Sequence, residues 1–166
     1  MEKERTKLEI RLFLLRLSVM AVTFWLLFGV LFGVTSMKDD SMMPKAAAGD
    51  LVLYYRLDKQ PEDRSLIVFR KEKKTYVSRV VARGGDRVEI RDDALYLNGS
   101  RMMETDIYYP TPAWEGTVEY PLTLEEDEVF VLSDYRERAK DSRYFGPVKR
   151  SEIKGTVLAV NRRTEL

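Results

Sequence analysis

The chain has 166 residues, with 28 Lys and Arg against 27 Asp and Glu, a formal net charge of +1. This balance argues against the strongly basic surface of a nucleic-acid-binding protein. The sequence contains no cysteine and no histidine, which excludes disulfides, thiol nucleophiles, Ser-His-Asp triads and the commonest metal ligands. We therefore expect no metal and no cofactor, and a hydrolase built from this chain needs Lys, Asp, Glu, Tyr or an amino terminus as its base.

The first predicted element is an uncharged apolar stretch over residues 17–37, with Arg16 before it and Lys38 after it. As a helix, it would span roughly 30 Å, the thickness of a bilayer core. A cleavable signal peptide is the main alternative, but its apolar region usually runs ~7–15 residues and ends in an A-x-A-like site. The stretch here is longer and ends in Val34-Thr35-Ser36-Met37. The sequence thus predicts a single retained transmembrane helix.

The charges beside this helix predict its orientation. Residues 1–16 carry five basic side chains, and the other flank offers Lys38 followed by two aspartates. The positive-inside rule places residues 1–16 in the cytoplasm and residues 38–166 on the outer side of the cell membrane.

The outer part is predicted to be mainly β, a folded barrel or sandwich of short strands. The Asn98-Gly99 dipeptide predicts a tight hairpin turn, and residues 103–123, which hold three of the six prolines, predict a long surface excursion. The candidate strands are residues 50–55, 66–69, 75–81, 87–90, 94–97, 128–132 and 155–160.

A serine follows the predicted membrane span closely. Ser41 lies four residues after Met37, in a segment that continues as Met42-Met43-Pro44. A serine in such a segment is more often a turn residue with a solvated hydroxyl, but its position near the bilayer favours a functional role. We expect Met42 and Met43 to contact the membrane interface and Pro44 to stiffen the turn.

Four further segments follow in order: residues 49–52 (GDLV), 76–86 (YVSRVVARGGD), 131–136 (VLSDYR) and 141–146 (DSRYFG). With Ser41 and the apolar helix, they resemble the type I signal peptidase family in its short, Gram-positive form, over nearly the whole chain. The resemblance implies a mostly β extracytoplasmic domain that rests on the lipid bilayer. It also implies cleavage of signal peptides of exported proteins after small residues, usually Ala at −1 and −3, by a Ser–Lys dyad.

The resemblance assigns Ser41 to the nucleophile position, but the general-base lysine is missing. Its position, directly before Arg79-Val80 and eight residues before Asp86, is occupied by Ser78. Lys45, four residues after Ser41, is the alternative candidate for the base.

Two other positions depart from the family pattern. Ala139 stands where the family has a serine that orients the lysine. Asp39 stands in the oxyanion-hole region, where a carboxylate would oppose the stabilisation of developing negative charge. Asp141, Ser142 and Arg143 match the family, and we expect an Asp–Arg pair there to hold the loop in place.

These departures leave two functions open. One is a membrane-bound serine endopeptidase with an altered base. Because general-base assistance is worth roughly 10²–10⁴-fold in rate, its cleavage would be slow or undetectable. The other is a non-catalytic protein similar to the signal-peptidase-like members of Gram-positive pilus-assembly systems. That resemblance implies binding of pilins or other exported segments together with a sortase.

Overall fold

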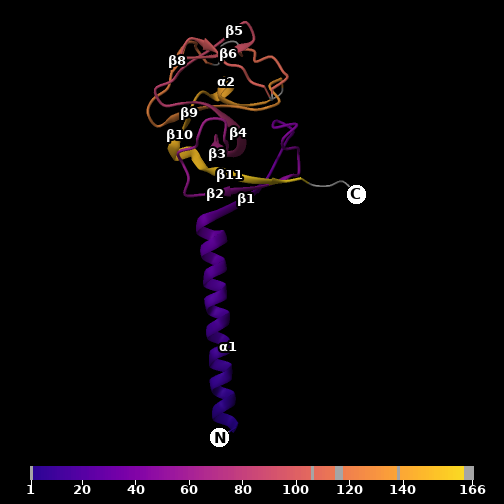
Figure 1. Cartoon of the computed structure of the whole chain (residues 1–166), viewed down its shortest axis with the longest axis vertical. Coiled ribbons are helices and arrows are strands. Elements are labelled where there is room, and N and C mark those ends of the chain that lie inside the picture. Colours follow the sequence, from indigo (N-terminus) through magenta and orange to yellow (C-terminus); the bar gives the residue numbers. More distant parts are fainter. Residues whose placement is uncertain (1, 106, 115–117, 138, 163–166) are drawn as a thin grey trace.

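A computed structural model describes residues 2–105, 107–114, 118–137 and 139–162. A long helix, α1 (Glu2–Trp25), continues as the π-helical turn η1 (Leu26–Leu31) and projects from a body made mainly of strands (Figure 1). Over Lys3–Leu31, the helix is long and apolar enough to cross a membrane, and none of its apolar window is buried in the protein. The expected mainly β fold with one N-terminal apolar helix is confirmed.

The helix ends earlier than the predicted span. Residues 17–37 were expected to be helical throughout, but Phe32–Ser36 form strand β1, which pairs antiparallel with β2 (Leu51–Tyr55). Tertiary packing explains the change, because pairing with β2 holds these residues extended and the Tyr54 ring occupies the space that a side chain at Gly33 would need. The helix therefore runs directly into the sheet.

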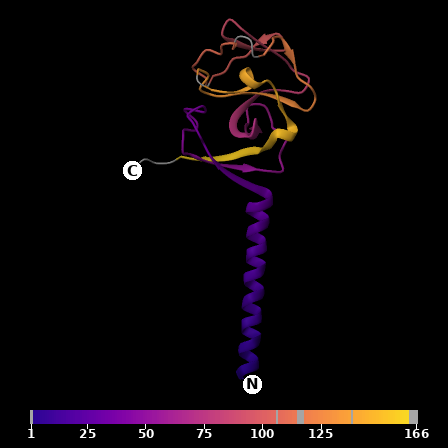
Figure 2. The same cartoon turned by 180° about the vertical axis from the view of Figure 1, so that it is seen from behind.

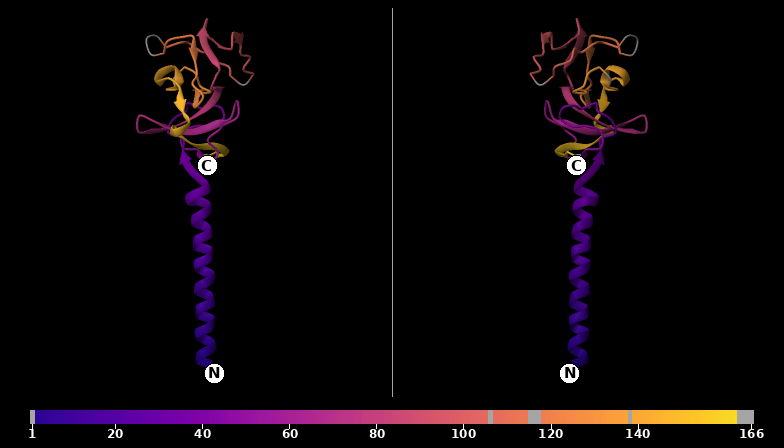
Figure 3. Two further views of the ribbon diagram at one scale, coloured as in Figure 1. Left: turned by 90° about the vertical axis from the view of Figure 1, so that its left-hand side faces the viewer. Right: turned by 90° about the vertical axis from the view of Figure 1, so that its right-hand side faces the viewer.

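The strands form two antiparallel sheets (Figures 1 and 3). The larger sheet, nearer the helix, has the order β1-β2-β11-β3-β4-β9-β10, and the smaller sheet at the far end has the order β7-β6-β5-β8. The other elements of the larger sheet are β3 (Leu66–Lys71), β4 (Lys74–Arg83), β9 (Glu128–Leu132), β10 (Val148–Lys149) and β11 (Ile153–Asn161). The smaller sheet comprises β5 (Arg87–Arg91), β6 (Ala94–Leu97), β7 (Ser100–Arg101) and β8 (Leu122–Thr123), and two short helices are α2 (Ser142–Phe145) and η2 (Arg150–Glu152).

Each of the predicted strands has its counterpart in these sheets, and Asn98-Gly99 forms the β6–β7 turn with positive φ at both residues. The surface excursion over 103–123 was only partly correct. Thr111 is buried, and its hydroxyl accepts a hydrogen bond from Arg136 at 2.6 Å, so this part of the excursion covers a buried guanidinium.

Met42 does not contact the membrane interface, contrary to the sequence-based expectation. Its side chain is fully buried in a core cluster with Met37, Ala46, Val52, Tyr54, Val68 and Val77, whereas Met43 is 43% exposed. The Ala46 N–H donates to the Met42 carbonyl at 3.0 Å. This hydrogen bond closes a turn from which both Met42 and Ala46 face the core.

A buried ion pair holds the segment between β9 and α2. Asp141 and Arg143 are both fully buried, and the guanidinium contacts both carboxylate oxygens at 2.9 Å. The carboxylate also accepts the backbone N–H groups of Ser133 (3.0 Å) and Arg143 (3.1 Å), and the latter bond caps α2. Arg143 donates further to the Arg136 carbonyl at 2.7 Å. One carboxylate thus fixes both ends of this loop.

Asp141→Asn should lower the free energy of unfolding by about 3–5 kcal/mol, because it leaves the buried Arg143 charge uncompensated. Urea unfolding of the full chain in detergent micelles measures this loss. The control is Glu125→Gln, which removes the exposed 3.6 Å pair with Lys149 and should cost less than about 1 kcal/mol. Equal losses in the two variants would contradict the structural role of Asp141.

Candidate active-site groove

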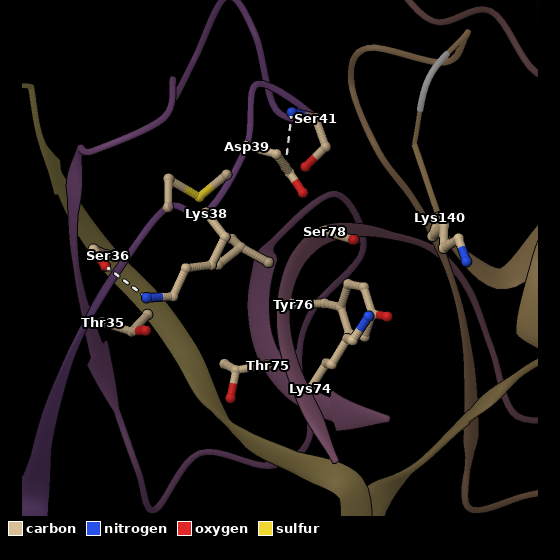
Figure 4. Close-up of a pocket in the computed structure, with 12 residues that line it drawn as sticks. Thr35, Ser36, Lys38, Asp39, Ser41, Lys74, Thr75, Tyr76, Ser78 and Lys140 are labelled. Carbon is tan, nitrogen blue, oxygen red and sulfur yellow. Dashed lines mark hydrogen bonds between the residues drawn. The ribbon is translucent and has the colours of Figure 1, made fainter. Parts of the chain in front are cut away.

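A groove of about 460 Å³ lies between two strand edges of the larger sheet (Figure 4). Among the described residues, β1 pairs only with β2, and β4 pairs with β9 only from Arg79 onward. Neither β1 nor residues 74–78 therefore has a described strand partner on the groove side. Unpaired edges of this kind accept an extended polypeptide as an added strand. The described residues that line the groove are Thr35, Ser36, Met37, Lys38, Asp39, Ser41, Lys74, Thr75, Tyr76, Val77, Ser78 and Lys140.

Ser41 reaches this groove from the segment after β1, which rises beside the end of β11 in Figures 1 and 2. The Ser41 carbonyl accepts the Tyr135 N–H at 2.9 Å, which fastens this turn to the loop between β9 and α2. Two segments far apart in sequence are thereby held together at the groove.

Asp39 caps the turn that carries Ser41. Its Oδ1 accepts the backbone N–H of Ser41 at 3.0 Å. In acyl transfer, the N–H of a nucleophilic serine is commonly one of the donors to the oxyanion. Here that donor is already bound to a carboxylate, whose charge would repel a developing oxyanion.

Ser78 lies at the base of the groove, between Ser41 and Lys140 (Figure 4). Its side chain is 1% exposed, and its hydroxyl has no hydrogen-bond partner among the described residues. The sequence assigns this position to the family's lysine, so the structure brings the nucleophile and base positions into one groove, with a hydroxyl in place of the amine.

Three lysines line the groove, but none is buried. Lys38, Lys74 and Lys140 are all exposed, and the Lys140 ammonium lies 4.3 Å from the centre of the Tyr144 ring. A lysine becomes a base when burial disfavours its charge. Lys45, the alternative base from the sequence, is not among the described lining residues.

Tyr76 does not replace the base either. Burial, and after it the negative charge of Glu72, raises the pKa of the Tyr76 phenol above its usual value of 10. The phenol therefore stays protonated near neutral pH and serves as a hydrogen-bond donor in the groove.

The remaining predicted site residues lie behind the groove. Ala139 is buried directly before Lys140, and its methyl group offers no hydrogen bond to Ser78. The Ser142 hydroxyl accepts the Val131 N–H at 3.0 Å, and Asp141 and Arg143 form the buried pair described above. Sequence reasoning missed Lys140, although its place next to Ala139 was a usable signal.

Comparison with known proteins gives consistent results. The sequence profile of the family described as signal peptidase, peptidase S26, matches residues 10–161. Signal peptidase I of Bacillus caldolyticus is 37% identical over 131 residues, which cover 70% of this chain and 72% of that protein. Signal peptidase IB of Staphylococcus aureus is 32% identical over 158 residues, which cover 82% and 83%. A crystal structure of a signal peptidase I from Enterococcus faecalis is 31% identical, covering 60% of this chain and 97% of that chain, with a TM-score of 0.49.

Two buried serines provide a test of the unpaired hydroxyl. Ser78→Ala should leave the free energy of unfolding unchanged or raise it by about 1 kcal/mol, because it removes a buried hydroxyl that has no partner. Ser142→Ala should lower the free energy of unfolding by about 1–3 kcal/mol, because the substitution leaves the buried Val131 N–H without its acceptor. Urea unfolding of both variants in detergent measures the difference, and a larger loss in Ser78→Ala would contradict the assignment.

Proposed function

Because this chain belongs to the peptidase S26 family of signal peptidases, we propose that it binds signal-peptide segments of exported proteins in the Ser41 groove and cleaves them poorly. The observation that carries this proposal is the buried, unpartnered hydroxyl of Ser78 at the family's lysine position, beside a serine whose N–H is bound by Asp39.

The placement of the groove supports the binding role. Helix α1 anchors the chain in the cell membrane, and its basic N-terminal residues keep that end in the cytoplasm. The β domain then stands on the outer side, where exported segments emerge. An extended segment adds to the free edges of β1 and β4, and the hydroxyls and backbone of the groove bind its main chain.

The groove chemistry limits the cleavage role. Attack by Ser41 requires a group that accepts its proton, and a serine hydroxyl such as that of Ser78 is a poor acceptor near neutral pH. Loss of the general base costs roughly 10²–10⁴-fold in rate. Loss of an oxyanion donor costs a further 10²–10³-fold, roughly.

A slow endopeptidase is the second candidate function. The presence of Ser41 and Lys140 in one groove favours it. Because an exposed amine accepts a proton only when it is neutral, such cleavage would rise steeply with pH.

For the binding role, the family resemblance makes pilin-like exported proteins, presented to a sortase, the candidate partners.

Restoring the family's dyad should restore cleavage. Full-length chain in detergent, carrying Ser78→Lys with Ala139→Ser, should cleave a fluorogenic Ala-x-Ala peptide about 10²–10⁴-fold faster than the unmodified chain. Adding Asp39→Gly, which frees the Ser41 N–H, should raise the rate further. Ser41→Ala in the repaired chain is the control and should abolish the gain.

Binding is measured separately, by fluorescence anisotropy of the same peptide. The unmodified chain should bind the peptide whether or not it cleaves it, and competing unlabelled peptide should displace it. Rapid cleavage by the unmodified chain that Ser41→Ala abolishes would overturn the proposal in favour of the endopeptidase. An absence of binding would overturn the binding role itself.

A further inference from the structure

The groove carries more positive charge than its own carboxylates neutralise. Lys38, Lys74 and Lys140 come from three separate segments and line the same groove as Ser41 and Ser78, with the Lys38 ammonium turned toward Ser36 (Figure 4). Asp39 is the one carboxylate among the described lining residues, and its Oδ1 is bound to the Ser41 N–H.

These lysines differ from two lysines elsewhere in the described part of the chain, which form ion pairs. Lys71 pairs with Glu152 at 2.8 Å, and Lys149 pairs with Glu125 at 3.6 Å. Within the described residues, none of the three groove lysines forms an ion pair. Lys38 donates to the Ser36 hydroxyl at 3.4 Å, and Lys140 contacts the Tyr144 ring. The ring contact holds the Lys140 ammonium without neutralising it.

Ser78 is the second, independent observation. A buried hydroxyl without a partner costs free energy unless a ligand or solvent completes its hydrogen bonds. This hydroxyl lines the same groove as the three lysines. A cationic rim over an unpaired donor is complementary to an anion.

We propose that the groove selects exported segments that carry an aspartate or glutamate within the bound stretch, whose carboxylate is bound by Lys74, Lys140 and the Ser78 hydroxyl. This inference rests on the proposed function, because it takes the occupant to be an extended polypeptide. The free edges of β1 and β4 favour a polypeptide over a lipid phosphate, since they offer main-chain pairing that a headgroup cannot use.

The test measures the affinity of full-length chain in detergent for paired peptides. The two peptides of a pair share one Ala-x-Ala sequence and differ only at a single position, which is glutamate in one and glutamine in the other. Successive pairs place this position at different points along the peptide. At low salt, one or more neighbouring positions should bind about 3- to 10-fold tighter with glutamate, as expected for two partly exposed charge pairs. High salt should remove most of this preference.

Substitutions in the chain test whether the groove lysines cause the glutamate preference. Lys74→Gln with Lys140→Gln should abolish the glutamate preference while leaving the affinity for the glutamine peptides nearly unchanged. The matched control, Lys59→Gln with Lys149→Gln, removes two exposed charges that do not line the groove. It should retain the preference. Ser78→Ala should weaken binding of the glutamate peptide by about 2- to 10-fold, the net loss of one typical hydrogen bond.

The outcomes separate this inference from the proposed function. Equal binding of both peptides of every pair would overturn the carboxylate preference and leave the binding role intact, whereas no binding of either would overturn the binding role. Competition by glycerol phosphate that depends on Lys74 and Lys140, with no glutamate preference, would replace the peptide carboxylate with a lipid headgroup phosphate as the ligand.

Discussion

The buried pair of Asp141 and Arg143 is the interaction on which the groove depends. Its carboxylate binds the Ser133 N–H at one end of the loop after β9 and caps α2 at the other. That loop supplies the Tyr135 N–H to the Ser41 carbonyl and carries Lys140 to the groove. Because a pair with no exposure is costly to break, the loop has little freedom to move away from the serine.

The framework and the chemistry are therefore separable in this molecule. The motif at residues 141–146 forms a capped helix and a buried ion pair, which the fold needs whether or not Ser41 reacts. The positions that the family resemblance assigns to cleavage lie outside this motif. In this chain they are occupied by Ser78, Ala139 and Asp39. Similarity across 10–161 establishes the family and the β framework, whereas activity depends on these few side chains.

The sequence predicted the strands well because their period-two patterns and turn residues are local signals. Local signals failed where tertiary contacts decide the conformation. Phe32–Ser36 belong to an apolar run that favours a helix, yet they pair with β2 as an added strand. Met42 was expected at the membrane, but the turn closed by the Ala46 N–H directs it inward. Lys140 and Ser78 lie far apart in the sequence yet line one groove, a juxtaposition that no local pattern predicts.

The charge of the groove has opposite consequences for catalysis and for binding. Were an amine present at position 78, the ammonium groups of Lys74 and Lys140 would disfavour its protonation and help keep it neutral, the form that can accept the serine proton. With a hydroxyl at that position, no amine benefits from this repulsion, and the same positive potential acts on the occupant of the groove instead. Asp39 also has opposite effects on catalysis and on the fold. Its carboxylate would destabilise an oxyanion during cleavage, but it stabilises the turn by accepting the Ser41 N–H. Under the proposed function, each departure from the family pattern thus weakens the chemistry while leaving the groove able to hold an extended segment.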